Sequence, residues 1–205
     1  MTTGITSLRR RPVQQRSAQR VERMLTACAE LVSELGYDGV TTTLIAERAG
    51  VAVGSLYQFF PDKRAVVQEL TLRNLDSFLA ELSKRFADPA MEHWSQAADA
   101  VFDLYISMHR TVPGFSSLHF GDVVDLRLLD GRKDNNMVLA ERLTVLFANR
   151  FDLPPDRLKL PLAVAIEAAD AVLNLAFRED PDGEPEILAE ARAMVRGYLA
   201  TRLDT

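Results

Sequence analysis

The stretch TTTLIAERAGVAVGSLYQFFPDKR, residues 41–64, decides the fold of this chain. Two short runs with helical spacing, Leu44 to Ala49 and Val53 to Phe59, are separated by Gly50 and two further residues. Any of the three threonines at 41–43 could cap the first run, and Gly50 permits the positive φ that a sharp turn requires. The pattern predicts a helix-turn-helix, the motif whose second helix fits the major groove of DNA.

The rest of the chain also predicts helices. Upstream, apolar residues at helical spacing predict an amphipathic helix over 18–35, with Ser17 as its cap and Gly36 as its stop. Downstream, Pro61 breaks the chain and Asp62 caps a long helix that reaches Phe86. We expect further helices at Trp94 to Thr111, Phe115 to Leu129, Asn135 to Phe151, Arg157 to Phe177 and Glu186 to Leu203. The sequence predicts an all-α fold: an arm and DNA-binding domain at 1–64 and a larger helical domain at 65–205.

Charge is distributed unevenly along the chain. The net charge is −5, but residues 1–64 hold nine Lys and Arg against six Asp and Glu, which gives this part +3. A basic module on an acidic body is expected when only one end approaches a polyanion. The arginines at 9–11, with Arg16, Arg20 and Arg23, form either an arm that enters the minor groove or a solvated tail; charge alone leaves both open.

Composition restricts the class of protein. Hydrophobic residues make up 47% and charged residues 26%, as in globular proteins. The single cysteine, Cys28, lies on the apolar face of its helix, so we interpret it as a core residue in a reducing, cytoplasmic protein. The most apolar run, Leu160 to Phe177, contains Glu167, Asp170 and Asn174, so we expect no membrane span.

Residues 18–66 resemble the N-terminal domain of the tetracycline-repressor (TetR) family of bacterial transcription regulators. The family pattern is approximately T-x-x-x-I-A-x-x-A-G-V-S-x-G-x-L-Y-x-Y-F-x-x-K. Eleven positions match it in register without a gap: Thr41, Ile45, Ala46, Ala49, Gly50, Val51, Gly54, Leu56, Tyr57, Phe60 and Lys63. The resemblance implies a DNA-binding regulator with double-stranded operator DNA as its partner.

The resemblance also implies roles for individual residues. Tyr57 and Lys63 would contact phosphates, and Thr42 or Thr43 would present a hydroxyl or N–H to the opposite phosphate rim. The outward positions of the second short helix would read bases: Val53, Gly54, Ser55, Gln58 and Phe59. Gln58 can bind adenine bidentately, and Val53 or Phe59 can contact a thymine methyl. We expect Phe60 to pack inward and Tyr57 and Phe59 to be exposed toward DNA.

Two residues depart from the family pattern. Ala52 stands where the family often has serine, which removes a hydroxyl that could cap the second short helix. Phe59 replaces a usual tyrosine, which removes one polar contact.

The last two predicted helices carry more apolar surface than one face needs. The excess is either internal core or an interface, and the resemblance implies that these two helices of each subunit form a four-helix dimer interface. A two-fold dimer would suit a palindromic operator with half-sites about 34–36 Å apart.

A small-molecule effector is the other implied partner. Aromatic and polarizable residues on the helices predicted after residue 94 fit a pocket for an apolar or aromatic molecule, although each could be ordinary core. The predicted contacts are Phe102, Tyr105, Met108, His109, Phe115, His119 and Phe120, with Asp170 and Asn174 as polar groups; Glu167 shares their helix face, which could instead be a solvated stripe. An effector would shift the long helix after Asp62 and so change the separation of the two reading heads.

We find no pattern for catalysis or for a cofactor. The three histidines lack the i, i+4 spacing of a helical zinc site, and neither a Gly-x-Ser-x-Gly elbow nor a phosphate-binding glycine loop occurs. His119 with Asp122 and Asp125 could hold a metal only as a chance grouping, so we predict no metal site. The alternative to a regulator is an all-helical small-molecule carrier without specific DNA binding.

Overall fold

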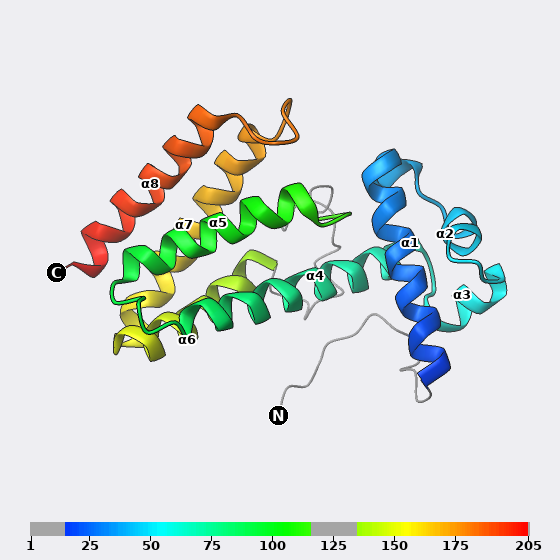
Figure 1. Ribbon diagram of the computed structural model, residues 1–205, viewed down its shortest axis with the longest axis horizontal. Helices are drawn as coiled ribbons and strands as arrows, with labels where there is room; N and C mark the ends of the chain where they lie inside the picture. Colours follow the sequence, from blue (N-terminus) through cyan, green and yellow to red (C-terminus); the bar gives the residue numbers. More distant parts are fainter. Residues whose placement is uncertain (1–14, 116–134, 205) are drawn as a thin grey trace. The chain divides into compact units, whose positions relative to one another are not determined.

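The computed structural model describes residues 15–115 and 135–204. Over these ranges the chain forms eight α-helices and no strand (Figure 1), which confirms the all-α prediction. The helices are α1 Gln15–Gly39, α2 Thr42–Arg48, α3 Val53–Phe59, α4 Lys63–Phe86, α5 Trp94–Thr111, α6 Asn135–Phe151, α7 Pro155–Ala176 and α8 Pro185–Leu203. The helix predicted at Phe115 to Leu129 lies outside the described residues apart from its first position.

The helix boundaries agree with the sequence patterns to within a few residues. The predicted bounds of α3 and α5 match those of the structure. α1 is longer than expected at both ends: it starts at Gln15 and continues past a kink at Gly36, whose φ of 67° and ψ of 170° are not helical. Asp62 caps α4, because its Oδ1 accepts a hydrogen bond of 2.9 Å from the Ala65 N–H.

The chain divides into two compact units. The first contains α1, α2, α3 and the start of α4 as far as Asn74, together with the turn after α5 that begins at Val112. Its core consists of the apolar faces of these helices, and Met24, Ile45, Leu56 and Phe60 are fully buried. This packing holds α2 and α3 against α1 on a rigid base.

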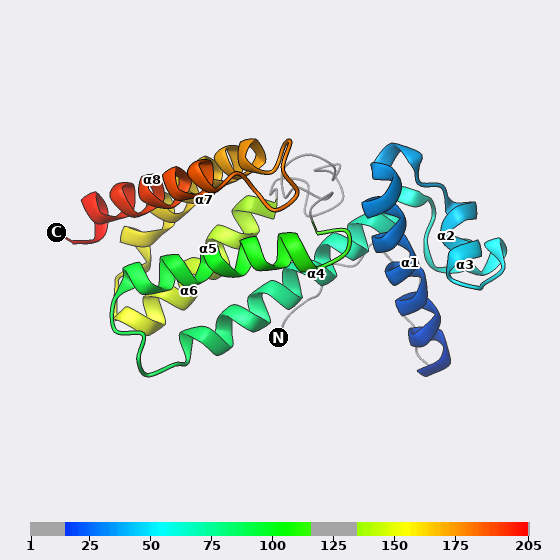
Figure 2. The same ribbon diagram turned by 45° about the horizontal axis from the view of Figure 1, so that its top comes forward.

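The second unit contains the remainder of α4 from Leu75, with α5, α6, α7 and α8. α7 and α8 run side by side in opposite directions (Figure 2). Apolar residues of α4 and α6 meet at the rings of Phe86 and Phe147, whose centroids are 5.3 Å apart. In the part of the chain that the structure describes, no helix is long and apolar enough to cross a bilayer.

Candidate functional site

The turn between α2 and α3 is fixed by backbone hydrogen bonds. Thr41 caps α2, with its Oγ1 accepting a 3.2 Å hydrogen bond from the Leu44 N–H. Gly50 takes a φ of 64°, and the next N–H, that of Val51, donates to the Ala46 carbonyl at 3.0 Å. A positive φ of this size favours glycine. No side chain caps α3, because Ala52 at the N-cap position offers no acceptor.

α3 has one buried face and one exposed face. Leu56 is fully buried and Phe59 is 5% exposed, whereas Gly54, Tyr57 and Gln58 are exposed. Val53 and Ser55 are partly exposed. The exposed face therefore holds five of the six α3 residues that the sequence predicts to contact DNA.

Phe59 corrects one expectation. We expected its ring to be exposed toward DNA, but it belongs to the core of the first unit. Leu56, Phe59 and Phe60 follow the i, i+3, i+4 pattern of one helix face, so the side chains at these positions turn inward together. The helical period itself contains the signal that would have placed Phe59 correctly.

Two hydroxyl groups meet at the edge of the exposed face of α3, which we call the reading face. Thr42 Oγ1 and Tyr57 Oη lie 3.0 Å apart in a hydrogen bond that joins α2 to α3. Tyr57 is 43% exposed, and Thr43 beside Thr42 is also exposed. The two helices thus present hydroxyl groups within reach of a single phosphate group.

Lys63 is engaged inside the protein. Its Nζ donates hydrogen bonds to the carbonyl oxygens of Tyr37 at 3.1 Å and Val40 at 3.1 Å, with Asp38 O at 3.5 Å. It also lies 4.4 Å from the centre of the Tyr37 ring. The ammonium therefore ties the start of α4 to the loop that follows α1, and a phosphate contact would compete with these carbonyl oxygens.

The first turns of α1 carry a row of arginines. Arg16, Arg20 and Arg23 are exposed and recur at i, i+4 and i+7, so they lie on one face of the helix. Among the described residues, no carboxylate lies within ion-pair distance of them. The Nη1 atom of Arg23 lies 3.9 Å from the position that a Cβ on Gly50 would occupy. The sequence groups these arginines with those at 9–11 as an arm or a solvated tail, although the helix predicted over 18–35 contains Arg20 and Arg23; in the structure Arg16 also lies in α1.

An ion-pair clamp sets the position of α2 on α1. Arg48 donates to both carboxylate oxygens of Glu34, at 2.9 and 2.8 Å, and to Glu30 at 3.3 Å. The hydrogen bonds from Arg48 lower the pKa of Glu34 below its usual value. These side chains are exposed, so the clamp fixes geometry and adds little stability.

Cys28 is buried in the core of the first unit, which confirms its interpretation as a core residue. Burial raises the pKa of the Cys28 thiol to about 12, and the charge of Arg73 opposes this shift in part. The thiol is protonated and unreactive near neutral pH.

The second unit contains a small cavity. Its volume is about 60 Å³, and most of its lining is apolar. The lining residues are Phe78 of α4, Val101, Phe102 and Tyr105 of α5, Asn136 and Leu139 of α6, and Ile166, Ala169, Asp170 and Leu173 of α7. Three of the predicted effector contacts, Phe102, Tyr105 and Asp170, therefore meet at one cavity.

Asp170 of α7 and Asn136 of α6 line the cavity, and each contacts a polar side chain of α7 that does not line it. Asn174 Nδ2 lies 3.5 Å from Asp170 Oδ2, and Asn136 Nδ2 donates to Glu167 Oε2 at 3.2 Å. Burial, with a further contribution from the charge of Asp170, raises the pKa of Tyr105 well above its usual value. The Tyr105 hydroxyl therefore remains protonated and able to donate a hydrogen bond at physiological pH.

The other predicted effector contacts do not line this cavity. Met108 and His109 are buried, and the His109 ring stacks on Phe177 with centroids 3.6 Å apart. Phe115 is buried and belongs to the first unit. His119 and Phe120 lie outside the described residues, as do Asp122 and Asp125 of the chance metal grouping. Within the described ranges, no group of three potential metal-binding side chains occurs.

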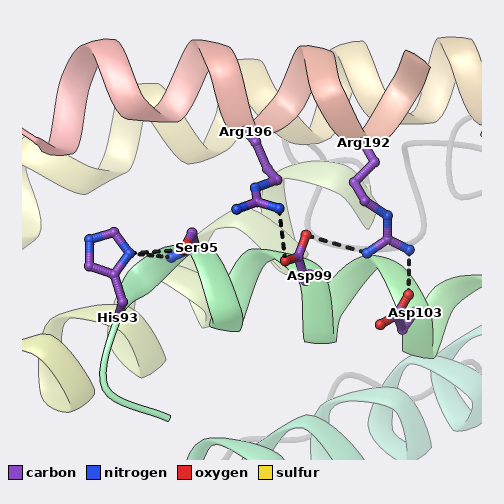
Figure 3. A network of polar contacts seen from close by, with 6 residues as sticks. All are labelled: His93, Ser95, Asp99, Asp103, Arg192 and Arg196. Atoms are coloured by element: carbon purple, nitrogen blue, oxygen red, sulfur yellow. Dashed lines mark hydrogen bonds and ion pairs between the residues drawn. The ribbon is translucent and has the colours of Figure 1, made fainter. Parts of the chain in front are cut away.

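Ion pairs join α5 to α8 on the surface of the second unit (Figure 3). Arg192 of α8 pairs with Asp103 and, at 3.3 Å, with Asp99, and Arg196 pairs with Asp99 at 3.4 Å. The Arg192 guanidinium also lies 4.8 Å from the centre of the Phe102 ring, which lines the cavity. α8 is thus held to the helix that supplies most of the aromatic cavity wall.

Comparison with known proteins places the chain in a family. Residues 24–70 match the model of bacterial regulatory proteins of the tetR family, and residues 92–203 match the tetracyclin repressor-like C-terminal domain. The chain belongs to the TetR family. It is accordingly a helix-turn-helix DNA-binding transcriptional regulator, and the family is not one of enzymes. The resemblance drawn from residues 41–63 is confirmed.

Individual TetR-family proteins resemble the chain to different extents. A TetR-family regulator from Streptomyces coelicolor of known structure is 39% identical, with a TM-score of 0.78 over 90% of this chain and 99% of that one. The repressor KstR of Rhodococcus jostii is 49% identical over 45 residues, which is 22% of this chain and 21% of KstR. An HTH-type regulator of Mycobacterium bovis is 34% identical over 86 residues, 40% of this chain, and the match spans only 44% of that relative's length.

One structural neighbour was solved with a small molecule bound. RolR in complex with resorcinol has a TM-score of 0.57 and 18% identity, over 90% of this chain and 94% of RolR. At this identity the similarity shows the shared fold alone.

Proposed function

We propose that this TetR-family protein is a homodimeric repressor that binds a palindromic operator and releases it when a small apolar or aromatic effector enters the second unit. The observation that carries the proposal is the division of α3 into a buried face at Leu56 and an exposed face at Gly54, Tyr57 and Gln58. An exposed helix face that carries a glutamine can read base edges in a major groove.

Phosphate contacts would flank this reading face. The Thr42 and Tyr57 hydroxyls would bind one phosphate, and the row of Arg16, Arg20 and Arg23 would follow the backbone beside it. These contacts give affinity without reading sequence, and each charged one adds to the salt dependence of binding.

A second copy of the chain would cover the exposed apolar stripe of α7. Leu160, Val164 and Leu175 are 70%, 41% and 46% exposed, and their spacing places them on one face. Met194 of α8 is 38% exposed. The buried residues of α7, such as Leu162 and Leu173, already supply the internal core, so this stripe is surplus to it and suits a two-fold interface.

The cavity would hold the effector only after it expands. Its volume of about 60 Å³ is far below the roughly 300 Å³ at the lower end of small-molecule pockets. Binding would therefore favour a conformation with displaced helices, which is the differential affinity that a ligand-controlled switch requires. RolR, which shares this fold, was solved with resorcinol, an aromatic molecule of the class proposed here.

A pair of variants tests the reading face. DNA upstream of the gene is used in mobility-shift and anisotropy titrations with the intact protein. Gln58→Ala should weaken operator binding by about 1–3 kcal/mol and relax preference at one base pair, without a change in salt slope. Arg20→Ala should reduce the salt slope by about one and leave base preference intact, so each variant is the control for the other.

Two outcomes would contradict the proposal. Unchanged affinity and preference in Gln58→Ala would show that α3 does not read DNA through this face. If the wild-type protein forms no salt-sensitive, sequence-specific complex, the alternative of a small-molecule carrier is favoured. For the dimer, Val164→Glu should give a monomer by native mass spectrometry, and a dimer in this variant would exclude the α7 stripe.

A further inference from the structure

The turn after α5 packs tightly against α1. Gly114 and Phe115 are buried, and Gly114 has a φ of 73°. A Cβ on Gly114 would lie 3.0 Å from Ala29 Cα and 3.2 Å from Ala29 O, both of which are backbone atoms of α1. Only glycine satisfies both this φ and this close approach.

One hydroxyl group fastens the turn to the helix. Ser33 Oγ donates to the Ala29 carbonyl at 3.0 Å and accepts a hydrogen bond of 2.7 Å from the Gly114 N–H. We name the contact among Ala29, Ser33 and Gly114 the Gly114 latch. It lies wholly within the first unit, although Gly114 is only three residues beyond the end of α5 in the second.

α5 also carries part of the cavity wall. Val101, Phe102 and Tyr105 line the cavity, and the helix continues from Tyr105 to Thr111. This segment is about 9 Å long at the rise of an α-helix, and a hydrogen-bonded helix transmits a displacement along its length. An occupant larger than about 60 Å³ must displace the helices that line the cavity, because packed interiors deform little.

We propose that cavity occupancy reaches the DNA-binding unit through α5 and the Gly114 latch, so that Ser33 and Gly114 are positioning residues for operator binding. The inference rests on the proposed effector response and adds a route to it. α1 receives the displacement at Ala29 and Ser33. The Arg48 clamp holds α2 on α1, and the shared core packs α3 against both helices. A displacement of α1 therefore moves α3 as well. Unlike the continuous helix α4, this route depends on a contact that one substitution can break.

The test uses a side chain as the cavity occupant, because it does not require the natural effector. Ala169→Phe places a ring in the cavity and forces the lining helices apart. Operator DNA is selected from a random pool with the wild-type protein, and affinities are measured by fluorescence anisotropy. We expect Ala169→Phe to weaken operator binding about tenfold, within the usual range for coupled sites.

Breaking the latch should remove most of this loss. In the Ser33→Ala background, Ala169→Phe should weaken binding less than about threefold, a difference that a double-mutant cycle isolates. Gly114→Ala, which introduces a Cβ into the contact, should act in the same way. Ser83→Ala is the matched control, because Ser83 Oγ makes the same kind of bond, to Leu79 O at 2.8 Å, on exposed α4 surface. Circular dichroism melts verify that each variant is folded.

Each alternative outcome has a distinct meaning. An equal tenfold loss with the latch intact and broken would overturn the latch route and leave the proposed effector response standing. If Ala169→Phe has no effect in the wild-type background, both the latch route and the coupling of the cavity to DNA are wrong. A loss that Ser83→Ala also removes would overturn the specific role of Ser33.

Discussion

The reading helix and the cavity are built in opposite ways. α3 rests on fully buried Leu56 and Phe60, so its exposed side chains are presented from a closely packed base. The cavity leaves about 60 Å³ unfilled among four helices. A recognition surface needs fixed geometry, whereas a sensor must be able to change its packing. The comparison teaches that close packing supports the exposed face of α3, whereas the proposed effector site lies where packing is incomplete.

The largest expected effect tests the close packing beneath α3. Phe59→Ala should destabilise the protein by about 3–5 kcal/mol in urea unfolding, because it removes a ring that is only 5% exposed. Tyr57→Phe, which removes an exposed hydroxyl on the same helix, should change stability by less than about 1 kcal/mol. Wild-type stability in Phe59→Ala would mean that the ring is not part of the core.

Truncation of a side chain that lines the cavity should cost somewhat less stability than truncation of Phe59. Leu173→Ala removes a side chain that is 4% exposed and enlarges the cavity, so we expect a loss of about 2–4 kcal/mol in urea unfolding. Leu35→Ala, the same truncation at a leucine that is 49% exposed, should cost less than about 1 kcal/mol. Equal losses in the two variants would contradict the burial difference between the sites.

Lys63 distinguishes a structural contact from a DNA contact. Lys63→Met should cost about 1–3 kcal/mol of stability, because carbonyl oxygens after α1 lose a charged donor. The salt slope of operator binding should stay unchanged if these carbonyls are the ammonium's partners. A slope smaller by about one, without a loss of stability, would instead support the phosphate contact that the family pattern implies.

The smallest expected effect concerns pH. The folded pKa of Cys28, about 12, lies above its ordinary value of 9.0, so folding is favoured fully below pH 9 and this advantage is lost as pH rises toward 12. Between pH 8 and pH 10 the wild-type protein should therefore lose about 1 kcal/mol more stability than Cys28→Ala. Parallel pH profiles of the two proteins in urea unfolding would contradict a buried, protonated thiol.

Local sequence patterns predicted the helix-turn-helix well and the cavity only in part. The bounds of α3, the cap at Asp62 and the buried Phe60 depend on residues within a few positions of one another, so helical periodicity and capping rules suffice. The cavity combines Phe78, Phe102, Leu139 and Ala169 from four helices, and no spacing in one helix reveals that they meet.

The errors have physical reasons as well. The family resemblance places Phe59 outward, whereas the helix period places it on the same buried face as Leu56. For Lys63 the family pattern predicts a phosphate contact, and local sequence does not reveal that its carbonyl partners, Tyr37 and Val40, lie 26 and 23 residues earlier in the chain. Close approach at Gly114 depends on tertiary packing against Ala29, which a glycine in a predicted loop does not reveal.

Because Ala52 gives α3 no side-chain cap, a substitution at this position could raise the stability of the free protein. The residue already has the extended backbone of an N-cap, with φ −66° and ψ 141°, so Ala52→Ser could add an acceptor without rearrangement. Such a change typically contributes about 1 kcal/mol. An engineer seeking a more durable biosensor scaffold could begin at this position.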